Sequence, residues 1–331
     1  GAINAVSQLH RDVTRDMFAP LWPDRPADQR PVGGITNGVH VPTWISATLA
    51  RLFDKHLTPG WREHYTDERF WEQVLDIPDE ELWSARQALR TYLFQFVRER
   101  ARQRWADDQA SANRLVAGGA MLDPNALTIG FARRFTAYKR PELVFRDLDR
   151  LARLVAGSRF PVQLVFAGKA HPADEAGKHH LQNVFRHALD PKLGGRIAFV
   201  DDYDLHVAHL LVQGCDAWLN TPRKPLEASG TSGMKAAMNG VPHLSIGDGW
   251  WAEGFTGKNG WLIAGTPASG DSDAVDAADA DALYRLLEDD VVPAFYDRDA
   301  RGLPKRWVAK VKQAIFTVTP RFSARRMVKD Y

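Results

Sequence analysis

The sequence predicts an α/β protein built on a parallel sheet that helices cover on both faces. Between residues 127 and 246, five short apolar runs alternate with segments of helical periodicity. Strands of a parallel sheet are buried on both faces and therefore read as continuous apolar runs. The length of 331 residues suits about two domains of roughly 150 residues each. The hydrophobic share of 44% and the charged share of 25% exclude a disordered chain, a collagen-like fibre and a coiled coil.

The chain up to about residue 125 is predicted to be mainly helical. Apolar residues recur every three or four positions from Ile3 to Met17, so we expect the chain to open inside an amphipathic helix and to be a fragment of a longer protein. The prolines between residues 20 and 36 predict a loop at a domain junction. A helical segment is expected to begin at Pro42, and a longer helix to span residues 79–105.

The rest of the chain alternates between predicted strands and predicted helices. The strands are expected at residues 127–131, 162–167, 196–200, 217–219 and 243–246. The helices are expected at residues 141–154, 175–189 and 206–211, with a fourth beginning near Ser232. Residues 267–281 are rich in Ala, Asp and Ser and predict a surface loop.

Charge and cysteine content narrow the class of protein further. The 43 Lys and Arg against 41 Asp and Glu leave a net charge of +2, which gives no basic field for nucleic acid or a membrane surface. A single cysteine, Cys215, excludes an intramolecular disulfide and favours the reducing cytoplasm. No apolar run approaches the roughly 18 residues of a membrane span. The histidines have no acidic or cysteine partner at ligand spacing, so no metal is expected.

Two polar segments follow predicted strands, where parallel sheets bind their ligands. The first, residues 132–140, carries Arg133, Arg134, Lys139 and Arg140 and no acid, between a strand and a helix. Backbone N–H groups of a helix start and clustered cations both favour an anion. A solvated basic loop is the alternative for this segment.

The second segment, residues 221–241, combines small residues with a lysine. Residues 229–233 offer hydroxyl groups and free backbone amides ahead of a helix, a suitable cradle for phosphate or sugar hydroxyls. Lys235 is expected in the first turn of that helix, where the positive dipole end disfavours its charge. A depressed pKa would suit Schiff-base chemistry, and a surface lysine is the alternative.

These segments resemble the glycogen/α-glucan phosphorylase family. Residues 227–240 fit E-A-S-G-T-x-x-M-K-x-x-x-N-G, the pyridoxal-phosphate signature of that family. Residues 4–10, 36–44 and 133–140 resemble its N-G-V-x-x-[IL]-H helix, T-N-G-I-x-x-x-x-W turn and K-R-x-x-x-Y-K-R anion loop, in the same order. Residues 321–331 resemble its C-terminal segment, so the resemblance covers nearly the whole chain. Residues 250–254 are most similar to the bacterial α-glucan phosphorylases.

The resemblance implies the two-lobed GT-B fold, with this chain as its C-terminal Rossmann-like lobe. Residues 1–36 would be the last helix and linker of a missing N-terminal lobe, and residues 37–331 the C-terminal lobe. Within that lobe, residues 37–125 are expected to be helical, 126–265 to form the α/β core and 276–331 to form C-terminal helices. The implied partners are the missing N-terminal lobe and a second copy in a homodimer.

The resemblance also implies an activity, phosphorolysis of an α-1,4-glucan such as glycogen or maltodextrin. Inorganic phosphate attacks the terminal glucose and glucose 1-phosphate leaves with retention, while the phosphate of pyridoxal phosphate passes a proton to the substrate phosphate. Lys235 matches the Schiff-base lysine, Arg134 and Lys139 match the substrate-phosphate ligands, and Arg133 faces the cofactor phosphate. Around the cofactor the resemblance places Thr231, Ser232, Gly233, Trp44 and Tyr203, and around glucose Asn37, Tyr138, Glu227, Ser229 and Gly230.

One position departs from the family pattern, and two other interpretations stay open. Asp204 stands where an arginine commonly supports the cofactor phosphate, and Arg223 or Lys224 are candidates to replace it. A sugar-nucleotide glucosyltransferase such as a glycogen synthase is similar around Glu227 but carries a second glutamate eight residues on, where this chain has Lys235. A non-catalytic carbohydrate-binding half is the other interpretation. Trp250 and Trp251 are expected either to stack on sugar or to pack in the core.

Overall fold

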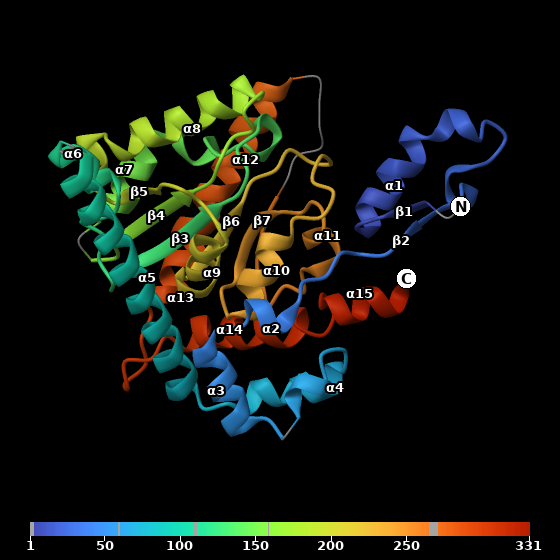
Figure 1. The fold of residues 1–331 in the computed structure, drawn as a ribbon, viewed down its shortest axis with the longest axis horizontal. Coiled ribbons are helices and arrows are strands. Elements are labelled where there is room, and N and C mark those ends of the chain that lie inside the picture. The colour runs from blue at the N-terminus through green and yellow to red at the C-terminus, as the bar shows by residue number, and fades with distance from the viewer. Residues whose placement is uncertain (1–2, 59, 109–110, 158, 265–270) are drawn as a thin grey trace.

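The computed structural model describes residues 3–331 except 59, 109–110, 158 and 265–270. Six parallel strands form the main sheet in the order β5-β4-β3-β6-β7-β8 (Figure 1). In the middle of the sheet Ile129 of β3 lies opposite Leu164 of β4 and Ala217 of β6. Helices cover both faces, so the predicted α/β class with a Rossmann-like parallel sheet is confirmed.

The elements have the following bounds. The strands are β1 (Ile3–Ala5), β2 (Val32–Gly34), β3 (Leu127–Ala132), β4 (Val162–Ala167), β5 (Ile197–Val200), β6 (Ala217–Asn220), β7 (His243–Ile246) and β8 (Gly260–Ile263). The helices before the sheet are α1 (Gln8–Met17), α2 (Val41–Trp44), α3 (Ala47–His56), α4 (Glu68–Trp71), α5 (Asp79–Asp108) and α6 (Ala112–Ala117). The later helices are α7 (Leu148–Ala156), α8 (Glu175–Ala188), α9 (Leu205–Gly214), α10 (Thr231–Met238), α11 (Trp251–Gly254), α12 (Ser272–Leu286), α13 (Val292–Tyr296), α14 (Lys305–Val318) and α15 (Ala324–Asp330).

The five predicted strands are present, and the structure adds β8 at one edge of the sheet. Two helix predictions and one loop prediction need correction. The segment from Pro42 forms two helices, α2 and α3, and Ser46 caps the second by accepting a hydrogen bond from Leu49 N. Helix α7 begins at Leu148 rather than at residue 141, because Asp147 caps it. The predicted loop at 267–281 is helical from Ser272 onward, and residues 267–270 lie outside the described part.

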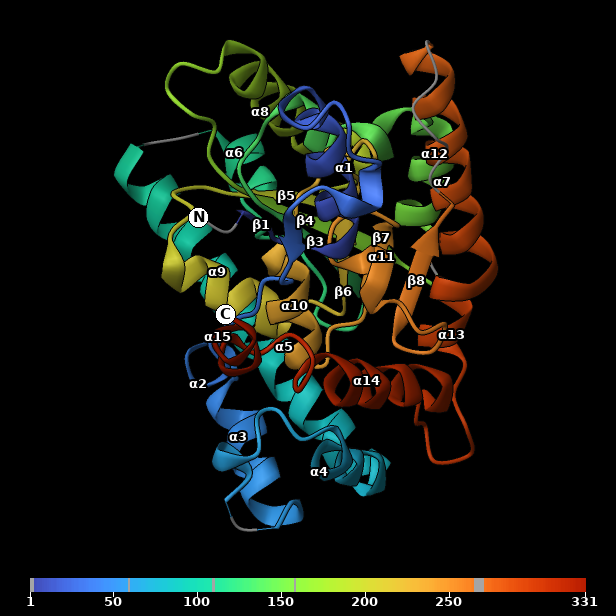
Figure 2. The same cartoon turned by 90° about the vertical axis from the view of Figure 1, so that its right-hand side faces the viewer.

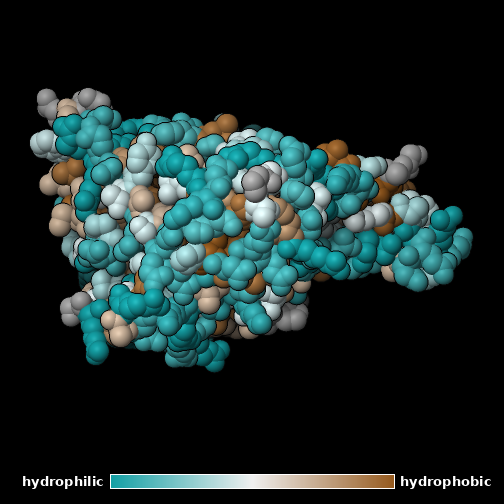
Figure 3. Space-filling view, turned by 90° about the horizontal axis from the view of Figure 1, so that it is seen from below, coloured by the Kyte–Doolittle hydropathy of each residue, from teal (hydrophilic) through white to brown (hydrophobic). Residues whose placement is uncertain are grey.

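The N-terminal segment is not the continuous helix that its apolar stripe predicts. Ile3–Ala5 is instead a strand, β1, that pairs with β2, and the helix starts only after Ser7, whose side chain accepts a hydrogen bond from His10 N. Because a hydroxyl cap satisfies a free N–H group of the first helical turn, Ser7 fixes the start of α1. The segment projects from the body of the molecule as an arm (Figure 3). Met17 on this arm is 65% exposed, so the predicted stripe is not a buried face.

The order of the strands creates a crevice at the centre of the sheet. From β3 the chain moves outward through β4 to β5, then returns to the other side of β3 and moves outward through β6, β7 and β8. Helices α7 and α8 lie on one face of the sheet, and α9 and α10 on the other (Figure 2). In such sheets ligands bind beyond the carboxyl ends of the two strands where the order reverses, which here are β3 and β6.

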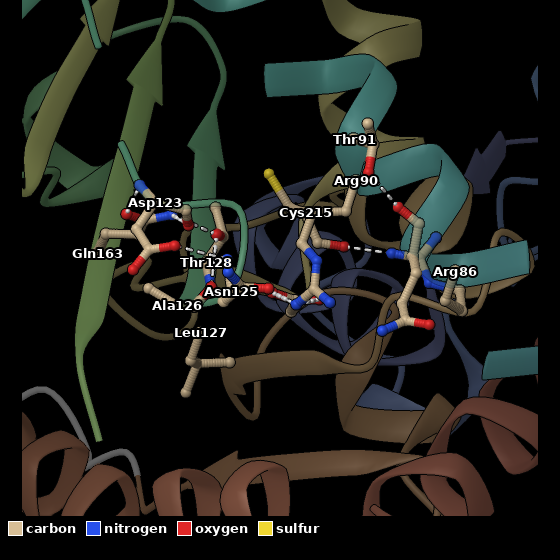
Figure 4. A network of polar contacts seen from close by, with 12 residues as sticks. Arg86, Arg90, Thr91, Asp123, Asn125, Ala126, Leu127, Thr128, Gln163 and Cys215 are labelled. Atoms are coloured by element: carbon tan, nitrogen blue, oxygen red, sulfur yellow. Dashed lines mark hydrogen bonds and ion pairs between the residues drawn. The ribbon is translucent and has the colours of Figure 1, made fainter. Parts of the chain in front are cut away.

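The long helix α5 is tied to the ends of the elements that carry this crevice. Arg86 and Arg90 reach from α5 toward the segment that holds Cys215 (Figure 4). Arg86 donates to the carbonyls of Gln213, Cys215 and Asn239, which lie at the C-terminal ends of α9 and α10. Burial lowers the pKa of Arg86 to about 10, so the guanidinium remains charged at neutral pH. One cation on α5 therefore satisfies carbonyls that the two helices leave unpaired.

Candidate functional site

The two loops that the sequence singles out meet at the reversal of strand order. Arg133 Nη2 and Lys139 Nζ, from the loop after β3, donate to the same Glu227 Oε2 at 2.5 and 2.6 Å. Glu227 comes from the loop after β6, and Asn220 at the end of β6 accepts from Arg133 Nη1 at 2.6 Å. We call Arg133, Lys139, Asn220 and Glu227 the Glu227 cluster. Two predicted phosphate ligands and a predicted sugar ligand therefore lie in one group.

The Glu227 cluster carries more positive than negative charge. Arg133, Lys139 and Glu227 are each less than 10% exposed, so two buried cations share one carboxylate. Burial and the charge of Arg133 lower the pKa of Lys139 to about 8. Burial pushes the pKa of Glu227 upward, but the charges of Arg133 and Lys139 outweigh burial and hold that pKa below its ordinary value. Because a buried unbalanced charge is costly, the cluster favours an anion as an additional partner.

The other two cations of the loop after β3 have different surroundings. Arg134 is exposed and lines a hollow of about 330 Å³ together with Lys169, His171 and Tyr203. Arg140 is buried and points away from the cluster, because its backbone is left-handed at φ 45. Its guanidinium pairs with Asp276 at 2.8 Å and Asp279 at 2.7 Å on α12. Arg140 therefore joins the loop to α12, so only three of the four cations in this segment, Arg133, Arg134 and Lys139, are left to face an anion.

Lys235 projects from α10 onto an aromatic ring. Its Nζ lies 3.8 Å from the centre of the Trp44 ring, and that ring meets His209 edge-on at 4.3 Å. Among the described residues, Lys235 has no hydrogen-bond partner for its amine. Burial lowers the pKa of Lys235, which increases the share of neutral, nucleophilic amine. The expected cause was the positive end of a helix, but Lys235 is the fifth residue of an eight-residue helix, so desolvation is the cause instead.

The start of α10 forms a glycine-lined cradle. Gly230 precedes the helix with φ 86, and no side chain caps the first amides, which belong to Thr231, Ser232 and Gly233. A Cβ atom at Gly233 would lie 2.4 Å from Cε1 of His243, so any larger residue here would collide with the imidazole. Among the described residues, the amides of Thr231 and Ser232 at this helix start have no hydrogen-bond partner and remain available to an anion, whereas Gly233 N donates to Gly230 O at 3.4 Å.

Comparisons with known proteins show the family of the chain. The family model described as carbohydrate phosphorylase matches residues 1–254. The chain is 49% identical over 329 residues to a glycogen phosphorylase of Aquifex aeolicus and 43% identical over 329 residues to a maltodextrin phosphorylase of Thermococcus litoralis. It is 45% identical over 328 residues to a glycogen phosphorylase of Mycobacterium tuberculosis. The chain belongs to the carbohydrate phosphorylase family.

The matched relatives are longer than this chain. The alignments cover 99% of the chain but only 47% of the Aquifex aeolicus protein and 38% of the Thermococcus litoralis and Mycobacterium tuberculosis proteins. The chain therefore spans less than half the length of these phosphorylase relatives. A doubly wound sheet with flanking helices is the architecture of a Rossmann-like GT-B lobe, as the resemblance implies.

Some residues that the phosphorylase resemblance implies lie elsewhere than in the Glu227 cluster. Asn37 sits at the base of the arm, where its backbone bonds to Val6 and Arg326, and none of its described contacts reaches Glu227. Asp204 caps α9 by accepting from Val207 N at 2.8 Å. Arg223 pairs with Asp276 at 2.6 Å, so this candidate to replace the expected arginine is already neutralised.

The remaining predicted residues surround the cluster or the core. Tyr138 lies beside Lys139, whose Nζ is 4.5 Å from the Tyr138 ring centre. Ser229 is buried next to Gly230 at the start of α10. Ser232 accepts a hydrogen bond from Trp218 Nε1 at 3.2 Å. Trp250 and Trp251 are 1% exposed, so core packing is the correct alternative for both.

Four residues of the site were missed from the sequence. Asn220 joins Arg133 to His243, whose Nε2 lies 3.2 Å from Asn220 Nδ2. Asp248 accepts a hydrogen bond from Glu227 N at 2.9 Å, and Lys169 lines the hollow beside Arg134. Position offered a signal for two of them, since Asn220 and Lys169 stand at or just after the ends of β6 and β4. No local pattern marks His243 or Asp248.

Two kinds of feature are absent from the described residues. Within them, no group of three or more His, Cys, Asp or Glu side chains is arranged to hold a metal ion. No helix in the same residues has both the length and the apolar character needed to cross a membrane.

Proposed function

We propose that the chain is the cofactor-bearing C-terminal lobe of an α-glucan phosphorylase, acting on glycogen or maltodextrin with pyridoxal phosphate as cofactor. The observation that carries this proposal is the placement of Lys235. The desolvated amine of Lys235 lies against the Trp44 ring. Lys235 belongs to α10, and the glycine-lined start of this helix faces the crevice that holds the Glu227 cluster. A nucleophilic lysine, an anion cradle and buried cations are the parts that this chemistry needs.

The residues present fit pyridoxal phosphate. Five buried polar atoms around the site have no hydrogen-bond partner among the described residues, namely Arg133 Nε, His209 Nε2, Ser229 Oγ, His243 Nδ1 and Trp250 Nε1. Buried polar atoms normally have partners, so orphans gathered at one place favour a ligand there. Lys235 would hold the cofactor covalently, with Trp44 and Tyr203 packing around it. The amides of Thr231, Ser232 and Gly233, together with Arg133, would bind its phosphate.

The chain's own residues would then position substrate phosphate and sugar. Bound pyridoxal phosphate supplies a phosphate group that gives and takes a proton beside the substrate phosphate. Lys139 and Arg134 would neutralise inorganic phosphate or the phosphate of glucose 1-phosphate. Glu227, Ser229, Gly230, Tyr138 and Asn37 would contact glucose, with Asn37 coming from the arm base.

Residues 1–36 are proposed to be the end of the preceding lobe, and residues 37–331 the C-terminal lobe. The arm exposes Met17, Phe18 and Leu21, apolar side chains suited to packing against further protein. Catalysis in a two-lobed enzyme depends on both walls of the cleft, which exclude water and orient substrate. We therefore expect the 331-residue chain alone to fold but to release no detectable glucose 1-phosphate. We also propose that the protein forms a homodimer and is located in the cytoplasm.

Covalent trapping of the cofactor tests the proposal. The chain is incubated with pyridoxal phosphate, reduced with borohydride and digested, and the labelled peptide is identified by mass spectrometry. Label on Lys235, and its loss in Lys235→Ala, is the expected result. Lys310→Ala is the matched control, because Lys310 is also desolvated and stacked 4.7 Å from a tryptophan ring, that of Trp261. Equal labelling of the Lys235→Ala chain would refute the assignment.

The glucosyltransferase alternative makes a different prediction in the same experiment. A sugar-nucleotide enzyme has no use for a lysine-bound cofactor, so it would bind UDP-glucose or ADP-glucose and show no specific label at Lys235. The lysine eight residues after Glu227 favours the phosphorylase.

A further inference from the structure

The turn after β7 is joined to the segment that carries Glu227. Asp248 Oδ2 accepts from Glu227 N at 2.9 Å, and Trp250 N donates to Ser229 O at 2.9 Å. Asp248 Oδ1 also accepts from Gly249 N at 2.8 Å, which closes the turn on itself. We call residues 248–250 the β7 turn. Its two bonds hold the backbone on either side of Ala228.

Glycine allows the β7 turn to approach this closely. Gly249 has φ 55, a left-handed conformation that other residues rarely adopt. A Cβ atom there would lie 2.4 Å from Ser229 O and 3.0 Å from Glu227 Cγ. Since Asp248 is only 2% exposed, water does not compete for its oxygens. The β7 turn and residues 227–229 therefore behave as one packed unit.

The position of this unit decides whether the Glu227 carboxylate can reach its partners. Glu227 Oε2 accepts from both Arg133 and Lys139, from the opposite side of the crevice. Hydrogen bonds of this kind weaken steeply when donor and acceptor shift out of line. Groups outside the immediate contact shell that fix such a side chain contribute strongly to a binding site.

We propose that Asp248 is a positioning residue for Glu227. Its carboxylate holds the Glu227 amide, and through it keeps the Glu227 side chain directed at the Glu227 cluster and at the bound sugar. The sugar contact rests on the proposed function, whereas the backbone restraint does not. Burial raises the pKa of Asp248 to about 6 although the amides of Glu227 and Gly249 oppose this, so the carboxylate is ionised and able to accept both bonds at neutral pH.

The test measures the restraint and its consequence separately in the 331-residue chain. Amide hydrogen exchange by NMR reports the Glu227 N–H in the parent chain, Asp248→Asn and Asp248→Ala. Isothermal titration in saturating pyridoxal phosphate compares affinity for glucose 1-phosphate with affinity for inorganic phosphate. Asp147→Asn is the matched control, because Asp147 also accepts a backbone N–H, that of Arg150, at the start of α7. Glu227→Ala gives the effect of removing the carboxylate itself.

The Glu227 amide should exchange about ten- to a hundredfold faster in Asp248→Ala, as expected when a hydrogen bond to a charged acceptor is lost. Asp248→Asn keeps one acceptor oxygen and should lie between the parent and Asp248→Ala. Glucose 1-phosphate should bind about tenfold more weakly in Asp248→Ala, whereas phosphate should bind no more weakly, because the cations that bind it are retained. Asp147→Asn should alter neither measurement. A merely structural role would weaken both ligands together.

Two results would overturn the proposal. Unchanged exchange of the Glu227 amide in Asp248→Ala would show that the bond restrains nothing. A glucose 1-phosphate preference lost in Glu227→Ala but retained in Asp248→Ala would show that the restraint does not serve the sugar. If Glu227→Ala itself leaves the preference intact, the sugar contact of the proposed function is wrong, and the exchange measurement alone decides the role of Asp248.

Discussion

Adding one methyl group at Gly233 should destabilise the lobe at the start of α10. Replacing glycine by alanine within a helix ordinarily stabilises it by about 1 kcal/mol. Here the new Cβ would lie 2.4 Å from His243 Cε1, well inside the roughly 3.5–4.0 Å of a carbon–carbon contact. Overpacking of this kind costs about 1–3 kcal/mol. The difference between these two effects predicts that Gly233→Ala lowers the free energy of unfolding by up to about 2 kcal/mol.

His243 cannot move aside cheaply. It is fully buried, with ring centres of Trp250 and Trp251 at 5.3 and 4.9 Å, and Asn220 holds its Nε2. Burial, together with the charge of Arg133, lowers the pKa of His243 to about 3, so the imidazole is neutral throughout the useful pH range. A change of pH in that range therefore does not alter the charge of His243 or its collision with the new methyl group.

Chemical denaturation of a double-mutant cycle measures the effect. Gly233→Ala should lower the free energy of unfolding in the parent chain and raise it by about 1 kcal/mol in a His243→Ala background, where the imidazole is gone. Ser232→Ala, at the neighbouring position, is the control for changes at the helix start. Stabilisation by Gly233→Ala in both backgrounds would refute the reasoning, because helix propensity alone would then explain the result.

Three further predictions concern the surroundings of the site. Arg86→Met should lower the free energy of unfolding by about 3 kcal/mol or more, since it leaves the carbonyls of Gln213, Cys215 and Asn239 without their donor; a loss below 1 kcal/mol in urea denaturation would contradict this. Sulfate, whose charge is constant in this range, should bind more weakly as the pH rises through about 8, because Lys139 is protonated below that value and neutral above it. Lys139→Arg should abolish this drop in affinity in calorimetric titrations at a series of pH values. A drop that persists in Lys139→Arg would assign it to another group. Cys215 should react with a thiol reagent only as fast as the chain unfolds, because it is fully buried and burial raises the pKa of its thiol. Rapid labelling of the native chain would contradict this, because it would show that the surroundings of Cys215 open without unfolding of the whole chain.

The centre of the fold could be predicted from the sequence because burial on both faces leaves a readable trace. Strands such as Val162–Ala167 are buried at every position, and every residue of this strand except Gln163 is apolar. Gly260–Ile263 lies at the sheet edge, where Leu262 is 39% exposed, and its apolar run is only three residues long. Helix α12 depends on the helix propensity of its alanines and on the cap at Asp271. Its content of Ala, Asp and Ser resembles that of a loop, so composition alone does not predict the helix.

The residue types of the candidate site were easier to predict from the sequence than its geometry. Motif spacing singled out Lys235 and Glu227, but charge alone could not distinguish Arg133 from Arg140. A single left-handed residue turns Arg140 toward α12, and that conformation has no signature in a non-glycine residue. His243 and Asp248 act through contacts between segments far apart in the chain, with Asp248 reaching back 21 positions to the Glu227 amide. Such contacts exist only once the sheet has assembled.

Substitution of this chain into a relative tests the central claim most directly. The chain replaces the aligned segment of the Aquifex aeolicus glycogen phosphorylase, to which it is 49% identical, and the hybrid is assayed with maltoheptaose and inorganic phosphate. We predict release of glucose 1-phosphate at about 1 per second or more, lost in the hybrid that carries Lys235→Ala and retained in the one that carries Lys310→Ala. A folded hybrid that is active with Lys235→Ala, or one that binds pyridoxal phosphate at Lys235 yet releases no glucose 1-phosphate, would contradict the account.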